Sequence, residues 1–139
     1  MKQDRFDTLT ADQRSELMSR IRAKDTRPEM RVRRLLHGLG YRYRLHAPDL
    51  PGRPDLVFRP QRKAIFVHGC FWHRHQGCLR SQVPKTRRDF WLAKLDGNVR
   101  RDRRNQAALR DQGWGVLVVW ECETKDLDQV AGRVREFLA

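Results

Sequence analysis

The chain has 139 residues, and 30 lysines and arginines against 17 aspartates and glutamates give it a formal net charge of +13. This length supports one domain with one core, so we expect a single domain over residues 1–139. The excess positive charge indicates a polyanionic partner, with nucleic acid as the first candidate.

Hydropathy and cysteine content indicate the compartment. No apolar run approaches the roughly 20 residues of a membrane span, and the first residues lack the apolar stretch of a signal peptide. We therefore expect no membrane partner and a cytosolic protein, in which thiols stay reduced. The 3 cysteines are an odd number, which disfavours a closed disulfide framework and leaves metal ligation as their better use.

Two helices are expected at the start of the chain. Thr10 with Gln13, and Thr26 with Glu29, each form a capping-box pattern. The first pattern opens a helical arm within residues 1–25 that we expect to contact DNA. The second opens a helix with one apolar face, formed by Met30, Leu35, Leu36 and Leu39.

Four strands are expected further along the chain. Residues 41–46 alternate like a half-buried strand, and a short strand starts at Asp55. Residues 63–68 form a compact apolar run with β-branched members, which predicts a more buried strand. Residues 114–120 are apolar throughout, which predicts a central strand covered on both faces.

The remaining segments predict helices. Residues 86–95 and 98–113 form two of them, the second capped by Asn98, and Asp126 caps a last amphipathic helix. The resulting order of elements is ααβββααβα. This order predicts an α/β fold, a small mixed β-sheet flanked by helices.

The cysteines fall into a metal-ligand pattern. Cys70, His75 and Cys78 form C-x4-H-x2-C, and Cys122 follows the strand at 114–120. Four nitrogen and sulfur ligands in a closed tetrahedral set indicate a structural zinc site. On spacing alone, His73 could replace His75 as the imidazole ligand.

A second pattern joins the two adjacent strands in the middle of the chain. Asp55 precedes one strand, and His68 ends the next. Nucleases use a carboxylate in such a position to hold Mg²⁺ against a phosphate, because it is a hard oxygen ligand. A backbone carbonyl can supply another oxygen ligand.

Five motifs resemble those of the very-short-patch repair (Vsr) endonucleases in their order and approximate spacing. They are "LPGRPDLVF", "FVHGCFWHRH", "VPKTRRDFW", "NVRRDRR" and "GWGVLVVWEC", and the similarity runs from about Lys24 to Cys122. The resemblance implies a restriction-endonuclease-like fold with a structural zinc. It also implies a Mg²⁺-dependent enzyme that nicks DNA on the 5′ side of the thymine in a T·G mismatch.

The partners implied are double-stranded DNA containing a T·G mismatch and other mismatch-repair proteins. The implied location is the nucleoid in the cytoplasm of a bacterium. A single nick needs only one active site, so we expect a monomer.

The resemblance also assigns roles to individual residues. Asp55 resembles the family's metal-binding aspartate, and the Val67 backbone carbonyl its second Mg²⁺ ligand. His73 resembles the histidine that acts on the scissile phosphate, with His68 as a second catalytic imidazole. Under this assignment His75, and not His73, is the zinc ligand.

Two acidic residues each allow two interpretations of their role. Glu29 matches a glutamate that reaches the metal through water, but it is also the third residue of a capping box. Asp102 matches an aspartate near the active site, and we favour support of a histidine over direct metal binding. Both are included among the candidate catalytic residues.

Three aromatic residues match side chains that insert into the DNA stack beside the mismatch in Vsr proteins: Phe71, Trp72 and Trp91. Apolar wedges of this kind open a mismatched step at low cost. Two alternatives remain open at this point. One is a restriction-type endonuclease of the same fold, and the other is a non-catalytic, zinc-stabilised DNA-binding module.

Overall fold

The computed structural model describes residues 25–139, so residues 1–24 of the expected N-terminal arm lie outside the described residues. The described part contains one four-stranded sheet in the order β1-β2-β3-β4. Strand β1 pairs antiparallel with β2, β2 antiparallel with β3, and β3 parallel with β4. The strands are β1 (Arg44–Leu45), β2 (Leu56–Phe58), β3 (Lys63–His68) and β4 (Gly115–Trp120).

Three α-helices and two short 3-10 helices complete the described chain. They are α3 (Arg27–Gly38), α4 (Arg88–Asp111), α5 (Leu127–Leu138), η1 (Leu79–Ser81) and η2 (Glu121–Lys125). The expected α/β class with a small mixed sheet is therefore confirmed. No helix in the described part is long and apolar enough to span a bilayer.

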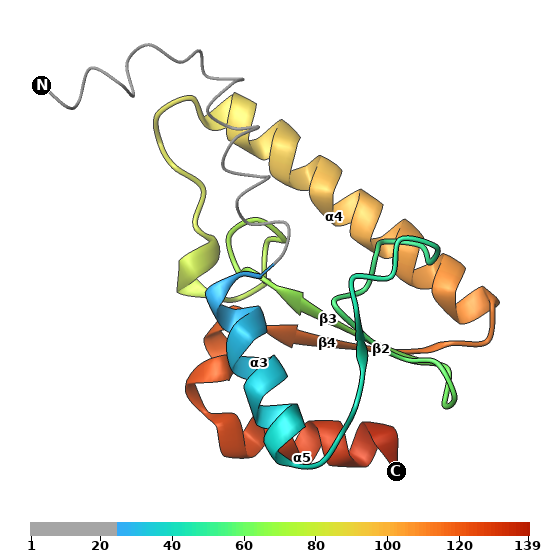
Figure 1. The fold of residues 1–139 in the computed structure, drawn as a ribbon. Helices are drawn as coiled ribbons and strands as arrows, with labels where there is room; N and C mark the ends of the chain where they lie inside the picture. The colour runs from blue at the N-terminus through green and yellow to red at the C-terminus, as the bar shows by residue number, and fades with distance from the viewer. Residues whose placement is uncertain (1–24) are drawn as a thin grey trace, which may run out of the picture.

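Successive side chains of β3 point to opposite faces of the sheet, so the core forms two layers. Ile65 and Val67 face one cluster with residues of α3 and α5, whereas Ala64 and Phe66 face a second cluster with Leu109 of α4. Helix α4 accordingly covers one face of the sheet, and α3 and α5 cover the other (Figure 1).

The predicted helix caps of α3 and α5 are confirmed. The Thr26 hydroxyl accepts the Glu29 N–H at 3.3 Å, and the Asp126 carboxylate accepts the Gln129 N–H at 3.3 Å. The predicted face of α3 is only partly right: Leu36 is fully buried, but Met30 is half-buried and Val32 is buried instead. The contact with α5 and β3 decides which residues of α3 face inward.

The two helices expected at 86–95 and 98–113 form the single helix α4, of 24 residues. The expectation of a second helix rested on Asn98 as its N-cap. In the folded chain Asp96 accepts a hydrogen bond from Arg74 at 2.7 Å, and Asn98 donates one to the Trp72 carbonyl at 3.0 Å. These contacts use the polar side chains in tertiary packing, so they do not cap a helix.

The expected central strand at 114–120 is wrong in position, because β4 lies at the edge of the sheet. Its apolar character follows from coverage on both faces: Val119 packs with the α3–α5 cluster, and Val118 packs with the α4 cluster. The strand expected at 41–46 pairs only at Arg44–Leu45. It ends there because His46 has φ +48°, which is outside the β region.

Candidate active site

The candidate site lies where β3 and β4 end. Parallel strands present their carboxyl ends at the same edge of a sheet, and β3 pairs with β4 up to His68 and Trp120. The loop of residues 69–78 follows β3, and η2 follows β4. Two segments that are 52 residues apart, at Cys70 and Cys122, therefore meet at this edge.

Asp55 lies immediately before the adjacent strand β2. Its Oδ2 accepts the backbone N–H of Val67 at 2.7 Å, which fixes the carboxylate beside β3. Burial raises the pKa of Asp55 to about 8, although the Val67 N–H lowers this pKa and the nearby Glu29 charge raises it. A carboxyl group held in this way favours a cation, because a cation would offset the cost of its ionisation.

Two imidazoles and a carboxylate form the next part of the site. The rings of His68 and His73 are stacked, with centroids 3.8 Å apart and an interplanar angle of 5°. His73 Nδ1 lies 2.6 Å from Asp102 Oδ2. A carboxylate only accepts, so Nδ1 carries the hydrogen and His73 Nε2 is left to accept or exchange a proton. Of the two readings of Asp102, this geometry matches the support of a histidine.

These side chains border a hollow of about 380 Å³ between the sheet edge and α4. Arg103 and Gln106 of α4 also line it, and both can donate hydrogen bonds to an anion. The lining of this hollow includes His68, His73, Asp102, Arg103, Gln106 and Trp120.

His68 is 5% exposed, and burial, followed by the nearby His73 charge, lowers its pKa well below the usual value. The unfolded chain then binds a proton at this position near pH 6.5 that the folded chain does not bind. His68 therefore contributes a positive slope of stability with pH between 5.5 and 7.5, opposite in sign to the slope that Asp55 contributes. His68→Phe should lessen this slope by up to ~1.4 kcal/mol per pH unit.

Urea denaturation of both proteins at pH 7.5 and 5.5 measures this effect. Comparing the two slopes removes the contribution of the cysteines and of His75, which both proteins retain. Equal slopes in wild type and His68→Phe would contradict the expectation.

The second cluster at this edge contains Cys70, His75, Cys78 and Cys122, whose ligand atoms all lie within 4.8 Å of one another. His75 Nδ1 lies 3.6 Å from Cys70 Sγ and 3.4 Å from Cys122 Sγ. A tetrahedral zinc with ordinary bond lengths separates its nitrogen and sulfur ligands by roughly 3.5 Å. The four residues therefore fit a zinc ion, and the imidazole among them belongs to His75 and not to His73.

The loop of residues 69–78 is held in shape by its own backbone. The N–H of His75 donates to the Cys70 carbonyl at 2.9 Å, and the N–H of Cys78 donates to the His75 carbonyl at 3.2 Å. The Cys122 N–H points at Cys70 Sγ at 3.4 Å. Burial raises the pKa of the Cys70 thiol to about 12, so this sulfur favours a bound cation over an isolated thiolate.

Trp120 joins the two clusters, a connection that no sequence pattern predicted. Its ring stacks on His75 with centroids 4.2 Å apart and meets His68 edge-on at 5.2 Å. The strand pattern explained Trp120 as a core residue, and only the pairing of β3 with β4 places it between the two imidazoles.

His46 is a further residue of this region that no sequence pattern predicted. Its Nε2 lies 2.7 Å from Glu29 Oε2, and its backbone N–H donates to the Asp55 carbonyl at 3.1 Å. The Glu29 side chain is 1% exposed and its Oε1 accepts the Asp25 N–H at 3.0 Å. One oxygen of Glu29 therefore accepts a backbone N–H next to the start of α3. The other oxygen is directed at His46, whose backbone binds Asp55.

The three aromatic candidates pack as one group. Phe71 meets Trp72 at 5.1 Å and Trp91 at 5.5 Å, and Trp72 meets Trp91 at 5.9 Å, all edge-on. Each is half-buried. The Asn98 amide holds the Trp72 carbonyl on α4, so this aromatic group, Phe71, Trp72 and Trp91, is fixed against a rigid helix beside the imidazoles.

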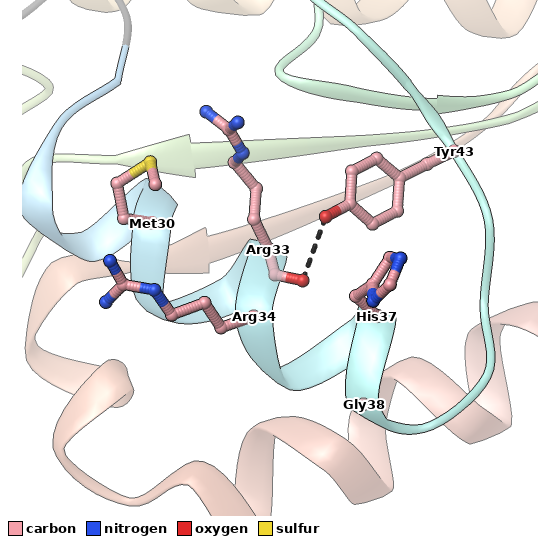
Figure 2. Close-up of a pocket in the computed structure, with 6 residues that line it drawn as sticks. All are labelled: Met30, Arg33, Arg34, His37, Gly38 and Tyr43. Carbon is pink, nitrogen blue, oxygen red and sulfur yellow. Dashed lines mark hydrogen bonds between the residues drawn. The ribbon is translucent and has the colours of Figure 1, made fainter.

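A second hollow, of about 390 Å³, lies along α3 and is lined by Arg33, Arg34, His37 and Tyr43, with Met30 and Gly38 (Figure 2). The Tyr43 hydroxyl donates to the Arg33 carbonyl at 2.9 Å. His37 is exposed there, two helical turns beyond Glu29. This hollow is separate from the imidazole cluster.

The chain is similar to several curated proteins over most of its length. It is 52% identical to the type II nicking enzyme V.XorIIP of Xanthomonas oryzae, covering 95% of this chain and 96% of that one. It is 46% identical to the DNA mismatch endonuclease Vsr of Escherichia coli, covering 84% and 74%. It is 42% identical to the type II nicking enzyme V.NmeAIP of Neisseria meningitidis, covering 86% and 85%.

Among solved structures, the catalytic domain of the homing endonuclease I-Bth0305I matches with a TM-score of 0.57 and 24% identity, covering 81% of this chain and 94% of that one. This likeness shows a shared fold. The family model described as DNA mismatch endonuclease Vsr matches residues 6–80. The chain therefore belongs to the Vsr family of DNA mismatch endonucleases.

Proposed function

We propose that this protein is a Mg²⁺-dependent endonuclease that nicks one DNA strand on the 5′ side of the thymine in a T·G mismatch. The observation that carries the proposal is the stacked His68–His73 pair with Asp102 on His73, in a chain of the Vsr family whose Asp55 carboxylate accepts the N–H of Val67, the residue before His68. A non-catalytic DNA-binding module has no need for this arrangement of ionisable groups.

The residues that would hold Mg²⁺ are Asp55, through its carboxylate, and Val67, through its backbone carbonyl. Both supply the hard oxygen atoms that this ion prefers. When bound, the ion neutralises charge at the scissile phosphate and polarises it. Glu29, buried beside Asp55, would add negative charge at the edge of this site.

His73 is the group best placed to move a proton during the reaction. Asp102 holds its Nδ1–H, which orients the ring and stabilises the imidazolium that forms when Nε2 takes up a proton. His68 stacks on this ring and is held neutral by burial. It can therefore donate or accept a hydrogen bond at the phosphate without repelling a protonated His73.

We further propose that Cys70, His75, Cys78 and Cys122 bind a structural zinc. The closed set leaves no position for a substrate. The zinc would tie the loop of residues 69–78 to the end of β4, and so it would fix the aromatic group and His73 relative to the sheet.

The aromatic group is proposed to enter the DNA stack at the mismatch. A T·G wobble pair stays stacked and hydrogen-bonded, so groove contacts alone discriminate weakly. Insertion of Phe71, Trp72 and Trp91 tests how easily the step opens. The exposed arginines of α4, including Arg100, Arg101, Arg103 and Arg104, would hold the phosphates without reading the sequence.

The proposed substrate also bears on the location and the oligomeric state of the protein. We propose that the protein acts as a monomer on the chromosome in the cytoplasm of a bacterium, because one nick needs one active site and the relatives named above are bacterial. Other mismatch-repair proteins are proposed as its partners on the same DNA.

A nicking assay with end-labelled T·G and T·A duplexes, with and without Mg²⁺, tests the function. We expect a nick only in the thymine strand of the T·G duplex and only with Mg²⁺. Cleavage of both strands of the matched duplex would favour the restriction-type enzyme, and binding without any cleavage would favour the non-catalytic module.

Trp72→Ala tests whether the aromatic group inserts into the DNA stack. We expect nicking of the T·G duplex to lose about one stacking interaction, ~1–3 kcal/mol or roughly 5- to 150-fold in rate, while binding to matched DNA changes little. Leu79→Ala is the matched control, because Leu79 is an 83% exposed apolar residue outside the aromatic group. Nicking of the T·G duplex by Trp72→Ala at the wild-type rate would refute the proposed insertion of the aromatic group.

A further inference from the structure

We propose that His46 is a positioning residue that orients the Glu29 carboxylate toward Asp55 and thereby strengthens the divalent-cation site; this inference rests on the proposed function. Neither the motifs nor the metal-ligand spacing in the sequence singles out this histidine. The structure places it between the two acidic residues of the site, through one side-chain and one backbone contact.

The contacts of Glu29 show why one donor matters. Its Oε1 accepts the Asp25 N–H at 3.0 Å, and its Oε2 faces two donors. His46 Nε2 is 2.7 Å away, whereas Arg33 Nη1 is 3.5 Å away and lies closer to Asp25, at 2.8 Å. Because a carboxylate only accepts, His46 Nε2 carries the hydrogen and makes the shortest of these bonds.

The position of Glu29 makes its orientation consequential. The side chain is 1% exposed, so water does not substitute for a lost protein donor. Without His46, Oε2 keeps only the longer contact with Arg33, at 3.5 Å. His46 contacts both Glu29, through its ring, and Asp55, through its backbone N–H, and the Glu29 charge raises the pKa of Asp55. A change in the direction of the Glu29 carboxylate would therefore change the negative charge that a cation at Asp55 experiences.

The backbone of His46 connects it to the same site. Its N–H donates to the Asp55 carbonyl, immediately before β2, and its φ of +48° turns the chain there. Histidine is among the non-glycine residues that adopt this conformation most readily. One residue thus fixes both the start of the strand that carries Asp55 and the Glu29 carboxylate beside it.

Two substitutions separate the hydrogen bond from the turn. His46→Gln keeps an N–H donor at a similar distance from the backbone, and His46→Leu removes it at similar size. Both have to adopt the same positive φ, so the difference between them reports the hydrogen bond. His37→Leu is the control, because His37 is an exposed histidine on the far part of α3 (Figure 2).

Binding of Mn²⁺, as a probe for the divalent cation, is measured by calorimetry on the DNA-free protein, and nicking is measured as a function of Mg²⁺ concentration. We expect His46→Leu to weaken Mn²⁺ binding and to raise the Mg²⁺ concentration for half-maximal nicking by about 10-fold or more. We expect His46→Gln to stay within about threefold of wild type and His37→Leu to match it.

A double-mutant cycle with Glu29→Gln tests whether His46 acts through Glu29. If it does, adding His46→Leu to Glu29→Gln causes little further loss of Mn²⁺ affinity or nicking. Fully additive losses would overturn the inference, as would wild-type Mn²⁺ affinity and Mg²⁺ dependence in His46→Leu. Either result leaves the proposed function intact as long as wild type nicks the T·G duplex, and failure of wild type to nick would overturn both.

Discussion

Asp55→Asn is expected to lose at least about a thousandfold of the Mg²⁺-dependent nicking rate, because the hard anionic ligand disappears and several kcal/mol of charge stabilisation goes with it. Asp55→Ala should lose as much. Binding to DNA should change little, since the arginines of α4 are untouched. Single-turnover nicking and a gel-shift titration at fixed salt measure the two quantities separately.

We expect Asp55→Asn to lose its nicking rate without losing stability, because the pKa of Asp55 is raised in the folded protein. Its folded pKa of about 8 lies above the usual value of 3.8, so between those pH values the folded carboxyl stays protonated while the unfolded one ionises. The aspartate therefore costs stability that increases as the pH rises through this window. Asp55→Asn avoids that cost, so its free energy of unfolding at pH 7 should not fall below that of wild type.

The matched control is Asp49→Asn. Asp49 is an exposed aspartate, paired with Arg59 at 2.7 Å, six residues before Asp55. The Asp49→Asn protein should nick the T·G duplex at the wild-type rate. Near-normal nicking by Asp55→Asn would show that the active site lies elsewhere.

Cys122→Ser is expected to lose the bound zinc and most of the stability of the fold. Structural zinc contributes on the order of 10 kcal/mol in small peptide sites, which is comparable to the ~5–15 kcal/mol stability of a whole domain. Cys122 is the ligand that η2 contributes to this cluster. Elemental analysis and thermal unfolding of protein purified without chelator measure both effects.

Two neighbouring histidines give the matched comparison. His75→Ala should lose zinc, because His75 Nδ1 lies with the three cysteines. His73→Ala should keep its zinc and lose most of its nicking, because His73 faces Asp102. The reverse pattern would exchange the roles of the two residues, and wild-type protein without zinc would end the assignment.

Local patterns in the sequence predicted much of the fold. The capping residues Thr26 and Asp126 mark the starts of α3 and α5, since a cap depends on residues within one turn. The apolar run at 63–68 predicted β3 with its bounds as observed. These features are short-range, so the sequence contains the whole of their cause.

The chemistry of the site was also accessible from residue types. Cysteine and histidine at metal-ligand spacing predicted the cluster at Cys70, and the motifs of the Vsr family pointed to Asp55, His68 and His73. What spacing left open was the identity of the imidazole ligand. The folded loop resolves the geometry by turning His75 toward the cysteines and His73 toward α4.

The sequence by itself therefore determined most of the elements, the family and the kinds of ligand, whereas tertiary structure decided which side chains meet and where some elements begin and end. Helix α4 continues through Gly97 because Asp96 and Asn98 find partners in the loop of residues 69–78. His46 reaches Glu29, and Trp120 reaches His75, only once the strands pair. Such contacts join residues 17 to 45 positions apart, so no local pattern records them, and the free energy of packing the whole sheet selects them.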